Sequence, residues 1–422
     1  MILLTQQDPG YEDARALHNG MIDRKPAVIA RVSSVADVVA ALRLAREKGY
    51  EVSVRGGGHG VAGKALGGDL VIDLSALRAV TVDERNRTAV VQGGATWSDV
   101  DTATQAYGLA VPGGRVSHTG VAGLTLGGGE GWLSALHGLT CDNLIAAELV
   151  AADGRHVLVD DARELELMNA LRGGGGNFGV VTSFTFRLHP VGPLVLGGMI
   201  GFRVCDAPMV LDTLDRLRSR PGFGGAAVFM TAPPAPFVPG DVVGRPILGV
   251  VPAYFGDLEV GSQVIRPLRE SALFDASAVM PYVALQSMLD EGAPPGLRNR
   301  WTGAYVEGLS PGLVTALQDH AVAAPSPLSQ IVLSAVSGQW LVHPMACWTD
   351  PADDAENIAW VDKLTAAIND HPVTGTYLNM EDPDDDRVRW ALRSRYADLQ
   401  RVKATWDPDD VFRHCAHIRL PS

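Results

Sequence analysis

Residues 51–60 read Glu-Val-Ser-Val-Arg-Gly-Gly-Gly-His-Gly, and the fold prediction starts from this stretch. The alternation at its start predicts a strand that runs directly into a glycine-rich turn. Upstream, residues 27–32 predict another strand, and Ser33-Ser34 offers an N-cap for an amphipathic helix that ends at Gly49. The chain therefore opens with a β-α-β unit that leads into a glycine loop carrying one histidine, His59.

Two more glycine-rich tracts follow, at residues 120–131 and 173–179. A helix-like stretch, 97–107, precedes the first of them, and the other lies between helix-like residues 164–171 and a β-branched run at 180–186. Because glycine has no Cβ, such loops can bring backbone N–H groups close to a phosphate. Three glycine loops in this part of the chain indicate one extended ligand that meets the backbone in several places.

Two of the tracts contain the pattern GxGxxG, at residues 58–63 and 174–179. In a Rossmann site this loop follows a strand and opens a helix. Here the later tract runs from a helix into a strand, and the earlier one continues into Lys64-Ala-Leu-Gly-Gly, a poor helix start. The sequence therefore predicts a different nucleotide-binding architecture. From spacing alone, His59 remains open as a nucleophile, a proton carrier or a hydrogen-bonding group of the loop.

Composition excludes several classes of protein. The chain has 422 residues with 46% apolar and 20% charged residues, as in ordinary globular proteins, and its net charge of −13 disfavours nucleic acid as a partner. Its four cysteines lie far apart without a CxxC pair, which favours free thiols. The N-terminus lacks a basic n-region, and no apolar stretch reaches membrane-spanning length. We therefore expect a cytoplasmic protein without a membrane span; the sequence does not indicate an oligomeric state.

The composition shifts after Pro190 and predicts three segments: 1–190, 191–385 and 386–422. The first should bind the nucleotide, the second should form a substrate domain, and the third should pack back on the first. Further expected elements are a strand pair at 69–74 and 88–92, helices at 260–273 and 387–404, and a solvated acidic loop at 382–386.

A succession of motifs resembles the FAD-linked oxidases of the vanillyl-alcohol oxidase superfamily, and most closely the berberine-bridge-enzyme-like branch. The motifs are Arg55-Gly-Gly-Gly-His59-Gly60, Val116-Ser-His-Thr-Gly-Val-Ala-Gly-Leu-Thr-Leu-Gly-Gly-Gly129, Cys141-Asp-Asn143, Leu171-Arg-Gly-Gly-Gly-Gly-Asn-Phe-Gly179, Tyr377-Leu-Asn379 and Trp406-Asp-Pro-Asp-Asp-Val-Phe-Arg413. The resemblance implies an α+β fold of two domains: a PCMH-type FAD-binding domain, and a central substrate domain built on an antiparallel sheet.

The resemblance also implies how FAD is held. His59 should bond covalently to the flavin 8α-methyl group. Many relatives have a second tether through a cysteine eleven residues before the triple glycine, where this chain has Val116, so we expect one covalent bond only. Thr119 matches a position linked to oxygen access. The predicted FAD-binding residues are His59, Arg55, Gly56, Gly57, Gly58, Gly60, Val116, Ser117, Thr119, Gly120, Gly123, Gly127, Gly128, Gly129, Asp142, Asn143, Gly179 and Val181.

Flavin chemistry needs a group that takes the substrate proton. Tyr377 matches a tyrosine with this role in some relatives, and Asn379 would share its face if the segment is a strand. A core tyrosine is the alternative, and a phenol would need nearby positive charge to act as a base. His343, in a stretch that is shorter than in relatives, is a second candidate, with a core histidine as the alternative.

The tail departs from the family pattern, because His414, Cys415 and His417 stand where relatives commonly have asparagines. Three adjacent donors without a fourth do not predict a metal site, and we expect these residues to alter the edge of the flavin.

We predict an oxidase that takes a hydride from an alcohol or amine of a small natural-product-like molecule and returns electrons to O₂. The alternatives are a flavoprotein that sequesters a toxic metabolite, and a dehydrogenase or cyclase with little use of O₂.

Overall fold

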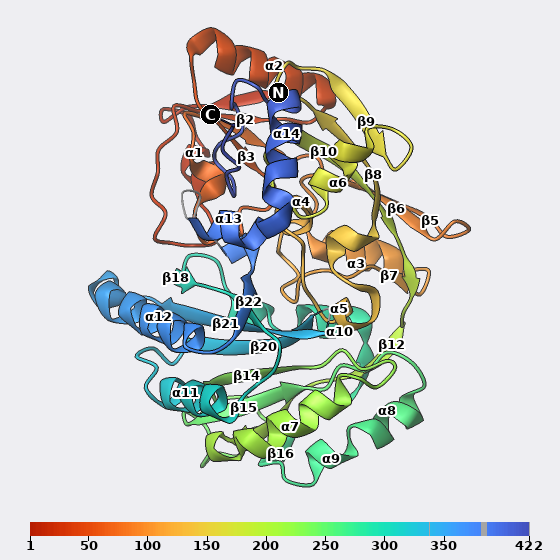
Figure 1. Ribbon diagram of the computed structural model, residues 1–422, viewed down its shortest axis with the longest axis vertical. Coiled ribbons are helices and arrows are strands. Elements are labelled where there is room, and N and C mark those ends of the chain that lie inside the picture. The colour runs from red at the N-terminus through yellow and green to blue at the C-terminus, as the bar shows by residue number, and fades with distance from the viewer. Residues whose placement is uncertain (337, 381–385, 422) are drawn as a thin grey trace.

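The computed structural model describes residues 1–336, 338–380 and 386–421, so most of the predicted acidic loop lies outside the described residues. The chain forms three main sheets with helices packed around them (Figure 1). The α+β class is confirmed. Among the described residues, no helix combines the length and the apolar composition that crossing a membrane requires.

The first sheet contains the β-α-β unit and has the order β1-β2-β4-β3. Its strands are β1 (Ile2–Leu4), β2 (Val28–Arg31), β3 (Val52–Arg55) and β4 (Leu70–Asp73), and α2 (Val35–Lys48) connects β2 to β3. Ser34 caps α2 by accepting a hydrogen bond from the Asp37 backbone N–H, and Gly49 ends it with φ of 68°. The predicted opening unit is therefore confirmed.

The second sheet is antiparallel, with the order β5-β6-β10-β8-β9. Its strands are β5 (Val80–Asp83), β6 (Thr88–Gln92), β8 (Leu144–Val150), β9 (His156–Asp160) and β10 (Val180–Arg187). The predicted pairing of β4 with β6 is wrong. Every residue of β4 is buried and it pairs in parallel with β2 and β3 on its two sides, so it has no free edge for β6.

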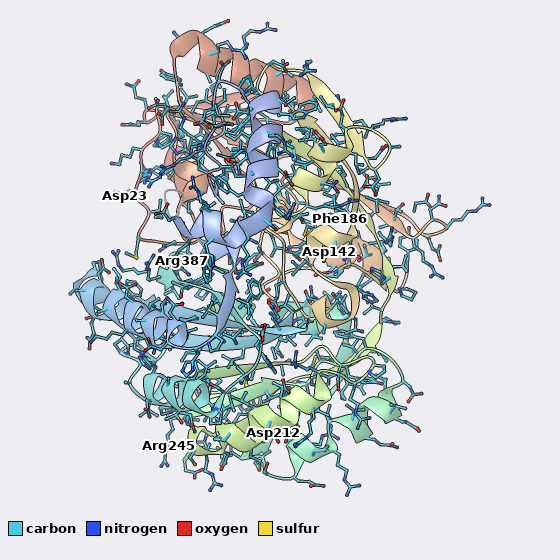
Figure 2. All side chains as sticks on the ribbon, viewed as in Figure 1. Asp23, Asp142, Phe186, Asp212, Arg245 and Arg387 are labelled. Atoms are coloured by element: carbon cyan, nitrogen blue, oxygen red, sulfur yellow. The ribbon has the colours of Figure 1, made fainter. Side chains whose placement is uncertain are left out.

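The third sheet has nine antiparallel strands and is covered on one side by α7, α11 and α12. Its strands are β13 (Ile200–Arg203), β14 (Ala226–Thr231), β15 (Pro246–Val251), β16 (Phe274–Asp275), β18 (Arg298–Trp301), β19 (Ala304–Val306), β20 (Gln330–Val336), β21 (Gln339–Trp348) and β22 (Val373–Thr376). The three helices span Ala207–Leu217, Pro311–Val322 and Asp354–Asn369. Its apolar core lies between the sheet and these helices, whereas charged side chains such as Asp212 and Arg245 point outward (Figure 2).

The remaining elements connect or cover the sheets. They are α1 (Tyr11–Arg15), α3 (Trp97–Gln105), β7 (Leu109–Ala110), α4 (Val121–Leu126), α5 (Ser134–His137), α6 (Leu165–Leu171), β11 (His189–Pro190), β12 (Leu194–Gly197), α8 (Leu258–Val264), α9 (Arg266–Arg269), β17 (Ala278–Pro281), α10 (Tyr282–Ser287), α13 (Asp386–Leu392) and α14 (Tyr396–Trp406).

Two predicted helices are each divided in two. The stretch 260–273 forms α8 and α9, because Pro267 has no N–H to continue the ladder of α8. The stretch 387–404 forms α13 and α14, joined by a tight turn in which Arg393 has φ of 43°.

The end of the chain returns to the N-terminal half. Leu399 and Val402 of α14, together with Ile418, are buried in one core with Trp97 and Phe184. These contacts agree with the prediction that segment 386–422 packs on segment 1–190. The exact segment boundaries stay a prediction.

Candidate functional site

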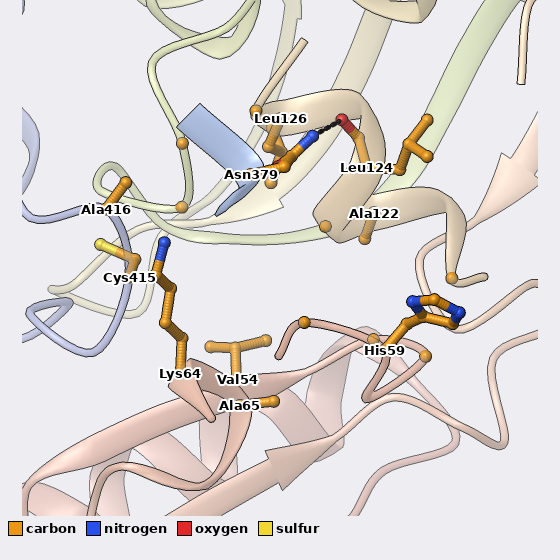
Figure 3. Close-up of a pocket in the computed structure, with 18 of the residues that line it drawn as sticks. Val54, His59, Lys64, Ala65, Ala122, Leu124, Leu126, Asn379, Cys415 and Ala416 are labelled. Atoms are coloured by element: carbon orange, nitrogen blue, oxygen red, sulfur yellow. Dashed lines mark hydrogen bonds between the residues drawn. The ribbon is translucent and has the colours of Figure 1, made fainter. Parts of the chain in front are cut away.

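A cavity lies where all three predicted glycine loops meet the end of the chain (Figure 3). Residues 56–60 follow β3, residues 119–127 include α4, and residues 175–181 lead into β10. Residues 377–380 and 412–416 complete the wall. Segments from both ends of the sequence therefore form a single site.

The first two glycine loops touch through their backbones. A Cβ built on Gly57 would lie 2.5 Å from the Gly120 Cα, and one on Gly120 would lie 2.3 Å from the Gly57 nitrogen. A Cβ on Gly127 would lie 1.8 Å from the Asn379 Oδ1. At Gly57 and Gly120 a side chain would force the two loops apart, and at Gly127 it would displace the Asn379 side chain.

His59 lines this cavity at the end of the loop that follows β3. Its ring stacks on that of His18 with 4.0 Å between centroids, and the His118 ring lies at 5.2 Å. Burial, and then the two neighbouring histidines, lower the pKa of His59 well below 6.5. The imidazole is therefore neutral at pH 7, with a ring nitrogen, Nε2, that has no hydrogen-bond partner among the described residues.

Tyr377 and Asn379 also line the cavity, but the predicted strand is wrong there. Strand β22 ends at Thr376, and residues 378–380 form a 3₁₀ turn. The turn still brings the two side chains together, because the Asn379 Nδ2 donates to the Tyr377 hydroxyl oxygen at 3.1 Å and to the Leu124 carbonyl at 3.1 Å. Burial raises the pKa of Tyr377 above its ordinary value of 10, against the lowering effect of the Asn379 donor.

His343 does not line the cavity. It lies on β21, with its ring edge-on to Trp301 at 5.8 Å, and Trp301 lines the wall. Its Nε2 is buried without a partner among the described residues, and burial lowers the pKa of His343 to about 3. The structure thus separates this candidate base from the cavity by one aromatic ring.

The residues predicted to contact FAD divide into two groups. Those that line the cavity are His59, Gly56, Gly57, Gly58, Gly60, Thr119, Gly120, Gly123, Gly127, Gly179 and Val181. Those outside the lining are Arg55, Val116, Ser117, Gly128, Gly129, Asp142 and Asn143. For each residue, contact with FAD itself stays a prediction.

The polar members of the second group hold the loops in place. Arg55 donates to the Ala14 carbonyl, and Ser117 donates twice to Asp290, at 2.7 Å from its nitrogen and 2.6 Å from its hydroxyl. Asp142 accepts from the Leu139 N–H at 2.8 Å, and Asn143 donates to the Leu139 carbonyl at 2.9 Å. These contacts fix the loop shapes that the cavity requires.

Sequence reasoning missed several cavity residues, and three of them have functional side chains or complete the wall near His59 and Tyr377. Lys64 follows the first glycine loop and extends across the cavity toward Cys415 (Figure 3), and its position just after that loop was the available signal. Trp301 and Met380 also line the wall. No local pattern marks Trp301, because β18 meets the glycine loop only in three dimensions.

The three donors of the tail have separate partners and do not converge. His414 Nε2 contacts Glu51 Oε2 at 2.9 Å, Cys415 Sγ lies 3.2 Å from Asn177 Oδ1, and His417 Nε2 lies 2.9 Å from Asp410 Oδ1. Only His414 and Cys415 line the cavity.

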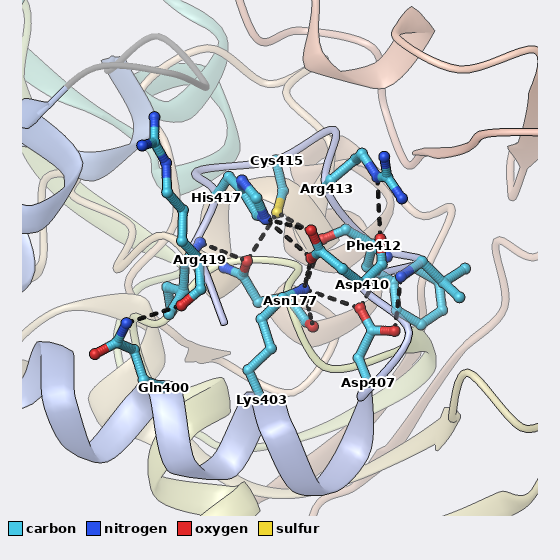
Figure 4. A network of polar contacts seen from close by, with 12 residues as sticks. Asn177, Gln400, Lys403, Asp407, Asp410, Phe412, Arg413, Cys415, His417 and Arg419 are labelled. Atoms are coloured by element: carbon cyan, nitrogen blue, oxygen red, sulfur yellow. Dashed lines mark hydrogen bonds and ion pairs between the residues drawn. The ribbon is translucent and has the colours of Figure 1, made fainter. Parts of the chain in front are cut away.

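A buried ion pair holds the tail against the third glycine loop (Figure 4). The Lys403 ammonium lies 2.9 Å from Asp407 Oδ2 and 2.9 Å from Asp410 Oδ1, and it donates to the carbonyls of Asn177 and Phe412. The side chains of Lys403 and Asp407 are fully buried. Asp407 also accepts the backbone N–H groups of residues 411 and 412.

Lys403→Met should therefore destabilise the whole protein. The substitution leaves the Asp407 carboxylate buried without its cation, a change that typically costs about 3 to 5 kcal/mol. We expect a clearly lower melting temperature by differential scanning calorimetry, whereas Lys363→Met, at an exposed position of α12, should change it little. Equal melting temperatures for the two variants would contradict this role of Lys403.

Comparisons with known proteins agree with this architecture. A family model described as an FAD binding domain matches residues 26–160, and one described as berberine and berberine like matches residues 376–419. An FAD-linked oxidoreductase of Dictyostelium discoideum is 34% identical over 319 residues, which cover 74% of this chain and 68% of that protein.

Two further similarities extend over nearly the whole chain. The (R)-6-hydroxynicotine oxidase of Paenarthrobacter nicotinovorans is 28% identical over 447 residues, covering 97% of this chain and 95% of that one. The crystal structure of 6-hydroxy-D-nicotine oxidase from Arthrobacter nicotinovorans has a TM-score of 0.89 at 25% identity, covering 99% and 97% of the two chains.

The fold, the cavity and these similarities define an FAD-dependent oxidoreductase. The chain belongs to the FAD-linked oxidoreductases of the vanillyl-alcohol oxidase family, in the berberine-bridge-enzyme-like branch, as its motifs predicted.

Proposed function

We propose that this enzyme holds FAD through one covalent bond at His59 and oxidises an alcohol or amine of a small natural-product-like molecule, with O₂ as electron acceptor. The observation that carries the proposal is the position of His59. His59 lines the same cavity as the Tyr377–Asn379 pair, and its buried Nε2 has no hydrogen-bond partner among the described residues. Relatives named as oxidases support the reaction type.

The residues of the cavity fit FAD. Close packing of Gly57 on Gly120 leaves a wall of bare backbone, which suits a ligand that lies along several loops. The Lys64 ammonium points into the cavity that Gly175 and Gly176 also line, and there it would balance pyrophosphate charge. When bound, FAD supplies the group that accepts a hydride.

Tyr377 and Asn379 would handle the substrate proton. The Asn379 side chain donates to the Tyr377 hydroxyl oxygen, and a hydrogen bond from the Glu130 backbone also reaches it; both contacts stabilise the deprotonated phenol. Because the pKa of Tyr377 is raised, its phenol is neutral at pH 7. Only its deprotonated fraction, which grows as the pH rises, can take the substrate O–H or N–H proton as the hydride leaves.

Stopped-flow spectroscopy tests the reaction type. Alcohols and amines are mixed anaerobically with the protein, and the reduced protein is then mixed with air. An oxidase is expected to be reduced by a member of the panel and to be reoxidised within its turnover time. Slow reoxidation after fast reduction would instead identify a dehydrogenase or cyclase, and tight binding without reduction would identify a sequestering protein.

The number of flavin bonds is a separate prediction. Burial raises the pKa of the Cys141 and Cys415 thiols to about 12, and that of Cys347 to about 11, so none of the three is a ready thiolate nucleophile. Peptide mass mapping should find one flavin-modified peptide, which contains His59. A flavin adduct on any cysteine, and on Cys415 of the cavity wall in particular, would contradict it.

A cytoplasmic location is part of the proposal. All four cysteines lie in the described part of the chain, and none forms a disulfide. Free thiols favour a reducing compartment.

A further inference from the structure

Three histidines form a cluster beside the cavity: His18, His59 and His118. The centroid of the His118 ring lies 5.2 Å from that of His59 and 5.6 Å from that of His18, and the Trp301 ring lies 5.8 Å from His18. One ring nitrogen of each histidine lies within 4.8 Å of the others. His18 Nδ1, His59 Nε2 and His118 Nε2 are all buried, and none has a hydrogen-bond partner among the described residues.

The position of His18 is fixed by main-chain contacts to both halves of the molecule. Its N–H donates to the Gly58 carbonyl at 3.0 Å, and its carbonyl accepts from the Gly296 N–H at 2.9 Å. The next residue, Asn19, donates to the Val61 carbonyl at 2.8 Å. His18 is therefore tied to the same loop that carries His59, on both sides of that histidine.

Three imidazoles with buried, unpartnered nitrogens call for a chemical reason, because an unpaired buried polar atom costs stability. Among titratable groups, histidine is the one that can hold or release a proton near neutral pH. Placed around a nucleophilic histidine, two more imidazoles can keep it neutral and can take its proton.

We propose that His18 and His118 are positioning residues for flavin attachment: they hold the His59 ring neutral and correctly oriented, and they accept the proton that it loses. The inference rests on the proposed covalent bond at His59. It assigns His18, in the N-terminal segment, and His118, just before the second glycine loop, to the attachment of flavin rather than to substrate oxidation.

The attachment step balances as follows. A bond forms between the His59 nitrogen and the 8α carbon of FAD, while one C–H bond of the methyl group and one N–H bond of the imidazole are lost. Two protons and two electrons leave. The electrons are received by the flavin ring and then by dioxygen, which becomes hydrogen peroxide. The imidazole proton leaves by way of His18 or His118, whose unpartnered ring nitrogens lie within 4.8 Å of that of His59.

Electrostatics agrees with this role. Burial, and then His18 and His118, lower the pKa of His59, and burial together with His118 lowers the pKa of His18 to about 4. His59 and His18 are therefore both neutral at pH 7. A neutral His59 retains the lone pair that bond formation needs.

A metal site fits the geometry less well. Two nitrogen ligands of a tetrahedral zinc ion with Zn–N bonds of about 2.0 to 2.1 Å lie roughly 3.3 Å apart, closer than the 4.8 Å spread of this cluster. The rings of His18 and His59 are also stacked within 13° of parallel, so their in-plane lone pairs do not converge on one point.

The test follows attachment rather than turnover. Full-length protein is purified from riboflavin-limited cells and mixed with FAD in air, and covalent flavin is measured over time by fluorescence of the denatured protein in a gel. The variants are His18→Phe, which keeps an aromatic ring without nitrogen, His118→Gln and the double variant. His156→Gln, at an exposed position of β9, is the matched control.

We expect each single variant to attach flavin about tenfold more slowly and the double variant about 10²- to 10⁴-fold more slowly, the usual worth of a positioned acid or base. Non-covalent FAD binding, measured by fluorescence quenching, should stay near the wild-type value, which a purely structural role of the histidines would not predict. Free imidazole added to His18→Gly should restore part of the rate. If His18→Phe does not fold, His18→Gln replaces it.

Wild-type attachment rates in the folded double variant would overturn the inference while leaving the bond at His59 intact. A wild-type protein that never attaches flavin would instead contradict the proposed function itself. The flavin-free wild type is also tested for zinc binding. The cluster would be a metal site if the protein bound one equivalent of Zn²⁺, if His18→Phe lost this binding, and if Zn²⁺ blocked attachment. That result would also overturn the inference.

Discussion

Tyr377→Phe should slow anaerobic flavin reduction by the substrate by about 10²- to 10⁴-fold, with FAD still bound. The substitution removes only the hydroxyl that Asn379 holds at 3.1 Å in the cavity. Substrate binding should change little, because the lost interaction is made mainly in the transition state. Stopped-flow absorbance at several substrate concentrations separates the rate from the affinity.

Tyr305→Phe is the matched control for this variant. Its ring lies 6.3 Å from that of Tyr377, edge-on, but Tyr305 does not line the cavity. The control should reduce flavin at nearly the wild-type rate. If reduction survives in Tyr377→Phe but collapses in His343→Gln, the base lies on β21 behind Trp301, and the tyrosine mechanism is wrong.

The assignment of Tyr377 as the base also predicts how the rate of flavin reduction changes with pH. Burial raises the pKa of Tyr377 above 10, so its deprotonated fraction grows with pH through the whole neutral and mildly alkaline range. Wild-type flavin reduction should therefore accelerate as pH rises toward 10, and Tyr377→Phe should lose this dependence. A wild-type rate that is flat from neutral pH to pH 10 would show that the phenol does not act as the base.

His59→Ala should convert all tightly held flavin to a releasable form. The substitution removes the only cavity residue for which we propose a bond to flavin, while the packed glycine loops that form the cavity wall remain. Acid precipitation should then leave FAD in the supernatant. His414→Ala, at the tail end of the same cavity, is the control and should keep its flavin in the pellet. Acid-stable flavin in His59→Ala would remove His59 from this role.

Local signals predicted the local structure well. Ser34 and Gly49 delimit α2 because capping depends on neighbouring residues, and the glycine runs predicted loops that line one cavity. Pairing between distant strands was not predictable in the same way. The sequences of β4 and β6 both predict strands, and only the parallel neighbours of β4 show that they belong to separate sheets.

The site residues also divide into those that local motifs predicted and those that only the folded structure reveals. His59, Tyr377 and Asn379 stand in recognisable motifs, whereas His18 and Trp301 reach His59 only because the N-terminal segment and β18 fold onto its loop. Asn379 illustrates a partial success: it was predicted to share a strand face with Tyr377, and the two side chains do meet, but through a 3₁₀ turn. Side-chain contacts between distant segments leave no periodic trace in the sequence.

The stoichiometry of acid-stable flavin in the wild-type protein tests the central claim most directly. The purified protein is precipitated with acid, the pellet is dissolved in denaturant, and the flavin absorbance is compared with the protein concentration. We predict one flavin per chain in the pellet and almost none in the supernatant. A colourless pellet, with the flavin released or never present, would contradict a covalent FAD enzyme built around His59.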